Sequence, residues 1–318
     1  MLMEMDAKRF PLHVLLGTGV TLLIFVVSLR APLVGLGTAL LTPLPVMIVC
    51  HRWGLRGGIL VVLIVALVTS TVFSPFLGAI FFTEFGLMGL LLHHWVEARG
   101  LSWDRGILLS SFIVLATLVL VVNVQSKMTG VNVADWMREE IGETGRRVLG
   151  ATVSDTTTPG SLSIDLEGLT NFTLRILPAL MILTVWLEGI INVALFTWFT
   201  NRFVSSHRRT VMKPEFSVWI FPDRLVWGGI LGGFLMVTRI SSLVTIGINV
   251  VTLLLAVYFL QGMAIVSFYF KKKKVPLGFR VIGYTMIGLI QFFLILVAAL
   301  GLFDIWADFR NLRRKTAV

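Results

Sequence analysis

Long, uninterrupted apolar blocks are the feature that most limits what this chain can fold into. A helix needs about 20 apolar residues to cross the hydrocarbon core of a bilayer, and nine blocks of the sequence are candidates for such crossings. They are residues 11–29, 33–50, 55–73, 75–93, 106–122, 170–200, 225–237, 242–270 and 281–303. Only 14% of the 318 residues are charged, too few to cover the surface of a soluble fold. The sequence therefore predicts an all-α, polytopic membrane protein with eight or nine spans.

The number of crossings depends on the shortest block, residues 225–237. It could form a short span, a re-entrant element or half of a broken helix. Basic residues favour the cytoplasmic side, and they place the N-terminus inside when all nine blocks cross. The same count leaves the basic tail around Arg310 outside, so eight and nine crossings both remain open.

A polar stretch separates two membrane regions. We expect an N-terminal membrane region at 1–122, an acidic extracytoplasmic loop at 123–169, and a C-terminal membrane region with a basic tail at 170–318. Apolar residues recur at helical spacing over residues 131–149, which predicts an amphipathic helix in the loop. This helix could lie on the outer membrane surface or cap the bundle.

The net charge of +10 is explained by membrane topology, because basic residues flank spans and meet anionic headgroups. We therefore expect membrane lipids as partners and no nucleic acid. Cys50 is the only cysteine, so an intrachain disulfide is impossible.

Ionisable and amide side chains inside the apolar blocks are the candidate ligand-binding residues, because such groups usually face a cavity or a polar partner. Glu188 and Asn192 are four residues apart and share a helix face. The candidate residues are Glu84, Glu188, Asn192, Asn249 and Gln261. The alternative is that they join helices by hydrogen bonds, or that Glu188 is protonated.

Basic side chains beside the blocks are candidates for docking lipid phosphate or an acidic partner. They are Arg52, Arg56, Arg208, Arg209, Lys271 and Lys272. Topology and snorkelling alone are the alternative explanation.

Motifs for ATP hydrolysis, zinc catalysis and serine hydrolysis are absent from the sequence. Adjacent His93 and His94 face different directions on a helix, so one metal would not readily bind both. We therefore expect no enzyme activity, no catalytic residues, no metal site and no cofactor.

Three motifs carry a resemblance to a known family. They are Pro43-Leu-Pro-Val with His51-Arg-Trp-Gly-Leu-Arg-Gly-Gly58, Phe259-Leu-Gln-Gly-Met-Ala-Ile-Val266, and Gly301-Leu-Phe-Asp-Ile-Trp-Ala-Asp-Phe-Arg310. Together they resemble the YybS-like family of bacterial membrane proteins, which has no agreed activity. The N-terminal half is also distantly similar to the substrate-binding subunits of energy-coupling-factor transporters. These resemblances imply a multi-pass protein of the bacterial cytoplasmic (inner) membrane.

Two functions follow from these features. The first is a carrier or substrate-capture component for a small solute, which lacks an ATPase and needs a partner module or an ion gradient. The second is a scaffold that docks other membrane proteins and transports nothing. The first predicts that the intramembrane polar residues converge, and the second predicts a solid bundle with an exposed docking surface.

Overall fold

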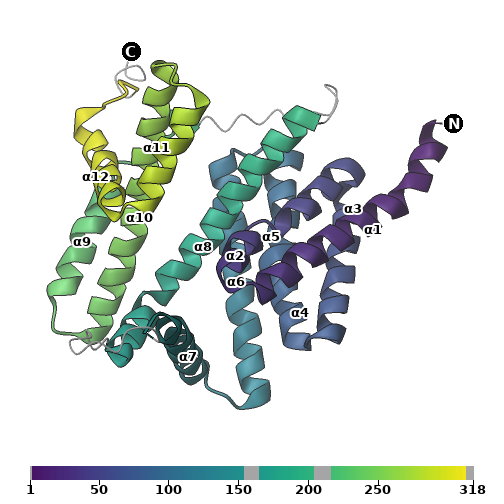
Figure 1. Ribbon diagram of the computed structural model, residues 1–318, viewed down its shortest axis with the longest axis horizontal. Helices are drawn as coiled ribbons and strands as arrows, with labels where there is room; N and C mark the ends of the chain where they lie inside the picture. Colours follow the sequence, from purple (N-terminus) through teal and green to yellow (C-terminus); the bar gives the residue numbers. More distant parts are fainter. Residues whose placement is uncertain (1, 154–164, 204–215, 313–318) are drawn as a thin grey trace. The chain divides into compact units, whose positions relative to one another are not determined.

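The computed structural model describes residues 2–153, 165–203 and 216–312, and every regular element in these segments is a helix (Figure 1). The all-α membrane class is thus confirmed. Within these described residues, six helical segments are long and apolar enough to cross a membrane, and a bent helix pair would make a seventh. The six are Phe10–Arg30, Gly37–Val72, Pro75–Ala98, Trp103–Thr129, Leu166–Phe203 and Ser241–Lys272. By this criterion the predicted eight or nine crossings are not confirmed, because some apolar blocks fold into bent or shorter helices.

Proline and serine set several helix starts. Pro32, Pro43 and Pro75 stand at the beginning of helices, where a missing N–H costs nothing. The Ser74 hydroxyl also accepts a hydrogen bond from the Leu77 amide, 3.1 Å away, and so caps the helix that follows.

In order, the elements are α1 (Leu2–Arg30), α2 (Pro32–Ala39), α3 (Pro43–Val72), α4 (Pro75–Phe81), η1 (Phe82–Gly86), α5 (Leu87–Leu92), η2 (His93–Ala98), α6 (Trp103–Thr129), α7 (Val133–Val153), α8 (Leu166–Phe203), η4 (Phe216–Val218), α9 (Leu225–Val237), α10 (Ser241–Lys272), α11 (Leu277–Leu289) and α12 (Gln291–Ala307).

The chain forms two compact units that are not contiguous in sequence. Unit 1 comprises Met1–Glu143 and Thr184–Pro214, and unit 2 comprises Thr144–Leu183 and Glu215–Val318. The long helix α8 contributes its first half to unit 2 and its second half to unit 1.

Helix α3 folds back on itself at Gly54, whose φ of 74° is a conformation that favours glycine. A Cβ atom placed on Gly58 would lie 3.6 Å from the Cβ atom of Cys50, eight residues earlier. A straight helix would separate two such residues by about 12 Å. Residues 43–53 and 55–72 therefore form a helical hairpin, as the two separate apolar blocks of the sequence predict.

The second apolar block, residues 33–50, is a broken helix. It consists of α2, a turn at residues 40–42, and the first half of α3. Gly35 lies against Ser28, near the end of α1, whereas Trp53 contacts Phe10, nearer the start of α1, with ring centroids 5.3 Å apart. The broken helix therefore runs back along α1, and its interruption lies between these two contacts.

Two apolar cores hold unit 1 together. In the first, the Phe25 ring of α1 contacts the rings of Phe81 and Phe85 at 5.1 and 5.6 Å. The second joins the first half of α3, α5, α6 and α8, and it includes Met47, Met88, Ile107 and Phe196.

Close glycine contacts hold unit 2 together, where α10 packs against both α9 and α12. A Cβ atom on Gly232 would lie 3.3 Å from the carbonyl oxygen of Gly247, and one on Gly301 would lie within 2 Å of the carbonyl oxygen of Tyr258. Such small residues let helix backbones approach closely.

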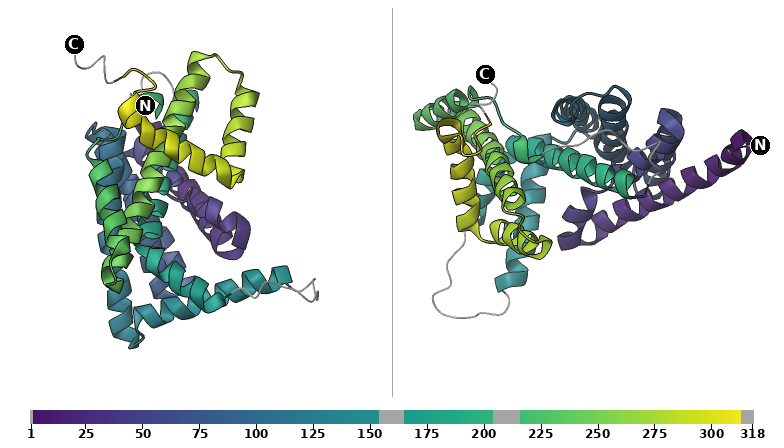
Figure 2. Two further views of the ribbon diagram at one scale, coloured as in Figure 1. Left: turned by 90° about the vertical axis from the view of Figure 1, so that its left-hand side faces the viewer. Right: turned by 90° about the horizontal axis from the view of Figure 1, so that it is seen from above.

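The last apolar block, residues 281–303, does not form one straight helix. The axes of α11 and α12 differ by 101° across the break at Ile290 (Figure 2). The Tyr269 hydroxyl near the end of α10 donates to the carbonyl oxygen of Phe309, which follows α12, at 2.9 Å. Both helices therefore end at the same end of unit 2, which we call the Lys271 end.

Helix α7 confirms the predicted helix of the long loop, with its bounds at Val133–Val153 rather than residues 131–149. Gly130, with a φ of 70°, terminates α6 in the left-handed conformation. Trp136 remains 43% exposed on α7.

Candidate functional site

Asn192 of α8 is bonded to the backbone where the broken helix is interrupted. Its side-chain Nδ2 donates to the carbonyl oxygen of Leu40 at 2.7 Å and to that of Glu188 at 2.8 Å. Leu40 follows α2, and Pro43 cannot donate a hydrogen bond back to the preceding turn. The break therefore exposes polar backbone groups to side chains of α8 in the interior of unit 1.

Glu188 lies one helical turn before Asn192 and is only 2% exposed. Its carboxyl group lies within electrostatic range of Glu84. Glu84 belongs to η1, a short π-helical segment, and is half-buried. Such π-bulges are frequent at functional sites. The structure thus brings together Glu84, Glu188 and Asn192, the three candidate residues of unit 1.

The unpaired polar atoms of this cluster are oxygens. Glu188 Oε1, Asn192 Oδ1 and Thr42 Oγ1 are buried and have no hydrogen-bond partner among the described residues. The N–H groups of Asn192 are already directed at backbone carbonyl oxygens. Unpaired buried polar atoms are rare and costly, so this cluster favours a bound cation or a ligand rich in hydrogen-bond donors. We call Glu84, Glu188, Asn192 and Thr42 the unit 1 cluster.

Two serines of α6 extend the polar interior of unit 1. The hydroxyl oxygens of Ser110 and Ser111 are also buried without a described partner. Ile107, one turn earlier on α6, packs against Gly189 of α8, so this part of α6 faces the helix that carries Glu188. No local pattern distinguishes these serines, because serine is common in membrane helices.

Asn249 lies in unit 2 and is bonded to the backbone of α8. Its Oδ1 accepts from the Ala179 amide at 2.8 Å, and its Nδ2 donates to the carbonyl oxygen of Arg175 at 2.7 Å. In a regular helix these two backbone groups would bond to each other. Asn249 therefore bridges a backbone pair of α8 beside Pro178, as the helix-joining alternative predicts.

Gln261 also lies in unit 2, within a buried polar network. Its Nε2 donates to Asp304 Oδ2 at 3.1 Å, and its Oε1 accepts from the Phe221 amide at 3.3 Å. Arg310 pairs with the same carboxylate oxygen at 2.9 Å and donates to the carbonyl oxygens of Ser217 and Trp219. The amides of Asn249 and Gln261 are thus bonded within unit 2, apart from the unit 1 cluster.

The docking candidates lie at the ends of helices. Arg52 and Arg56 flank the turn of the α3 hairpin and are exposed. Lys271 and Lys272 are exposed at the end of α10, where Lys271 donates to the Ser217 hydroxyl at 3.0 Å. Arg208 and Arg209 lie outside the described residues.

Sequence reasoning missed a cluster of three titratable side chains in unit 1. His51 of α3 and His93 of η2 both direct Nδ1 at the carboxylate of Glu97. The spacing of His93 and Glu97, four residues apart, was a usable local signal. The approach of His51 depends on the α3 hairpin and had no local signal. We call these three residues the His–Glu–His cluster.

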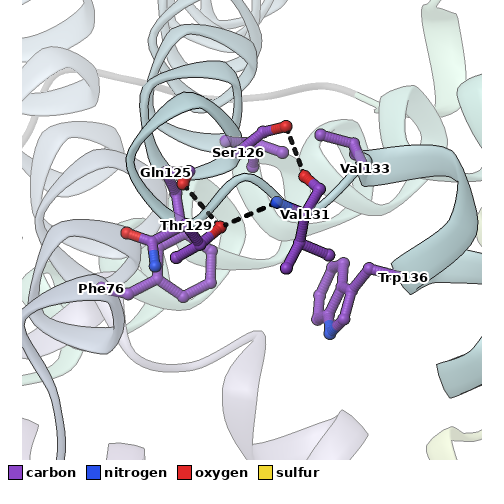
Figure 3. A pocket seen from close by; sticks show the side chains of 8 residues that line it. Phe76, Gln125, Ser126, Thr129, Val131, Val133 and Trp136 are labelled. Atoms are coloured by element: carbon purple, nitrogen blue, oxygen red, sulfur yellow. Dashed lines mark hydrogen bonds between the residues drawn. The ribbon is translucent and has the colours of Figure 1, made fainter.

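A cavity of about 230 Å³ lies where α6 turns into α7, and no predicted site residue lines it (Figure 3). The Ser126 hydroxyl donates to the carbonyl oxygen of Val131 at 2.6 Å, which fixes this turn. The lining residues are Phe76, Val122, Gln125, Ser126, Thr129, Val131, Val133 and Trp136. The lining is mostly apolar, so the cavity offers few groups that could fix the orientation of a polar solute.

Metal binding finds no support in the described segments. There, no group of three or more His, Cys, Asp or Glu side chains is arranged to hold a metal ion. In the His–Glu–His cluster, the carboxylate occupies the position between the two imidazoles that a metal would need.

Comparison with known proteins gives the family of the chain. No curated protein and no solved structure matches it. A family model described as a predicted membrane protein, DUF2232, matches residues 19–305, which is most of the chain. With its apolar helices and multi-pass character, the chain therefore belongs to the DUF2232 family of predicted membrane proteins.

Proposed function

We propose that this protein is a carrier or capture component for a small cationic or donor-rich solute, which binds at the unit 1 cluster. The observation that carries the proposal is the set of buried, unpaired oxygens beside the broken helix α2–α3. Broken helices line substrate sites in many transporters, because irregular backbone at membrane depth is tolerated where it faces a cavity or buried protein.

The chemistry of the cluster selects the class of ligand. Glu84 and Glu188 are two acidic groups within electrostatic range of each other, and a bound positive charge would offset their repulsion. Asn192 contributes only its oxygen, because its nitrogen is bonded to carbonyl groups. Small ammonium compounds and monovalent cations fit this arrangement, whereas anions do not.

Replacing Glu188 with glutamine tests this site. With the full-length protein in detergent, we expect Na⁺, methylammonium or putrescine to raise the thermal unfolding temperature of the wild type, because a ligand stabilises the state that it binds. Glu188→Gln should weaken that binding at least tenfold, about 1.4 kcal/mol. Glu139→Gln, which removes an exposed carboxylate on α7, is the matched control and should bind normally.

Transport itself is tested by uptake of ²²Na⁺ and labelled putrescine into liposomes that contain the protein. Uptake that Glu188→Gln reduces and Glu139→Gln preserves would support a carrier. If none of the probes binds or enters, or if Glu188→Gln behaves as the wild type, the solute site is wrong. The scaffold alternative then becomes the better explanation.

The topology that we propose has eight crossings with both termini in the cytoplasm of a bacterial cell. The crossings are α1, the broken helix, the second half of α3, the segment Pro75–Ala98, α6, α8, α9 and α10, and α11–α12 is a re-entrant pair. The support is that Lys271 and Arg310 both contact Ser217 at the Lys271 end. Lys271–Lys274 and the basic tail then share the cytoplasmic side, which removes the conflict in the charge count.

Cysteine labelling tests this topology. In a Cys50→Ser background, Ser161→Cys should react with a membrane-impermeant maleimide in intact cells, because the loop is extracytoplasmic. Val318→Cys should react only after the membrane is permeabilised. Labelling of Val318→Cys in intact cells would contradict an even number of crossings.

A further inference from the structure

The His–Glu–His cluster has a geometry suited to holding a proton. His93 Nδ1 lies 2.7 Å from Glu97 Oε2, and His51 Nδ1 bonds to the other carboxylate oxygen. The side chains of both histidines are 11% exposed and that of Glu97 is 18% exposed. The three groups are therefore largely shielded from bulk water and directly bonded to one another.

The hydrogen bonds leave an acceptor open. When each imidazole is neutral and donates through Nδ1 to an ionised Glu97, each Nε2 carries a free lone pair. His51 Nε2 is buried and has no hydrogen-bond partner among the residues that the structure describes. In this state the cluster has a net charge of −1, which is costly where water is scarce. One added proton converts an imidazole to an imidazolium paired with the carboxylate, and the net charge becomes zero.

We propose that His51, His93 and Glu97 form a binding site for one exchangeable proton.

Other titratable or charged groups lie near the His–Glu–His cluster. On α3 the neighbour is Cys50, which lies within electrostatic range of Glu97. His13 on α1 contacts Trp53, and His94 and Arg99 contact Trp95. Arg52 is exposed next to His51. From α8 the neighbour is Phe196, whose uncharged ring contacts His51 at 5.5 Å. From α6 it is Gly106, which packs against Val96.

The proton site and the unit 1 cluster lie along one face of α8. Glu188, Asn192 and Phe196 follow one another at intervals of four residues, so their side chains share a helix face. Phe196 contacts the His–Glu–His cluster, and Asn192 contacts the break in the broken helix. The link between the two sites rests on the proposed carrier function. In that function, the proton is the ion whose gradient drives uptake of the solute.

Nuclear magnetic resonance of the full-length protein in detergent, with ¹⁵N-labelled histidine, tests proton binding directly. The chain has five histidines, which His→Gln variants would assign. We expect His51 and His93 to titrate as a coupled pair, because they share one carboxylate. In Glu97→Gln the two histidines should titrate independently, since the carboxylate that couples them is lost. His94→Gln, the adjacent histidine outside the cluster, should leave the pair unchanged.

A second variant covers the case in which Glu97→Gln does not fold. His51→Gln retains the bond between His93 and Glu97, so the coupled pair should collapse to a single titration of His93. The proposal is overturned if His51 and His93 titrate independently in the wild type, or if neither variant alters their midpoints.

Liposome uptake separates this proposal from the carrier function. Putrescine or ²²Na⁺ uptake should respond to an imposed pH gradient in the wild type and lose that response in Glu97→Gln. Coupled titration without any uptake would keep the proton site and reject the carrier. Uptake that a pH gradient does not affect would keep the carrier and reject coupling by protons.

Discussion

Replacing Arg310 with methionine is expected to lower the free energy of unfolding by about 3–5 kcal/mol, the usual cost of breaking a buried ion pair. The side chains of Arg310 and Asp304 are 1% and 2% exposed and lie 2.9 Å apart. Methionine fills much of the arginine volume but leaves Asp304 without its charged partner. It also leaves the carbonyl oxygens of Ser217 and Trp219 without their donor.

The measurement is denaturation of the full-length protein by sodium dodecyl sulfate in mixed micelles, followed by circular dichroism. Arg239→Met is the matched control, because Arg239 is an exposed arginine of unit 2 and its loss should change stability little. Equal stability of the two variants would show that the buried network does not hold the C-terminal end of α12 to the segment before α9.

Replacing Gly301 with alanine is the second substitution with a large expected effect, a loss of about 3 kcal/mol from overpacking. The added Cβ atom would lie within 2 Å of the Tyr258 carbonyl oxygen and 2.7 Å from the Gly262 amide nitrogen. Both are backbone atoms, which cannot rotate away as a flexible side chain could. Helices α10 and α12 would have to separate, and the hydrogen bond between Gln261 and Asp304 would be stretched.

Gly288→Ala provides the control, because nothing lies within 4 Å of a Cβ atom at that position of α11. Alanine favours a helix over glycine by about 1 kcal/mol, so this variant should be as stable as the wild type or more so. The same denaturation experiment compares the two. Unchanged stability of Gly301→Ala would contradict the close approach of α10 and α12.

The residues of the candidate site show how far sequence reasoning reached. Glu84, Glu188 and Asn192 were identified because polar side chains are costly inside an apolar block. Asn249 and Gln261 met the same criterion, yet they bond to unit 2 groups 70 and 40 residues away. Composition along one helix indicates that a polar side chain needs a partner, but it does not indicate which partner.

The two bent segments show a similar limit. Pro43 and Gly54 indicate interruptions in the sequence, and the structure has a break and a hairpin there. Nothing comparable marks Ile290, where α11 and α12 meet at 101°. Beyond that bend, α12 packs closely against α10 through Gly262 and Gly301, which lie far apart in the chain.

The amino-acid sequence by itself determined that this protein is a bundle of membrane helices. In lipid each backbone N–H must find an acceptor within the protein, and a single long apolar segment can supply nearly all of its own acceptors only as a helix. The tertiary structure alone decided which polar groups meet: His51 with Glu97, Asn192 with Leu40, and Gln261 with Asp304. These contacts join helices that are distant in sequence, and only the packing of whole helices fixes such distances.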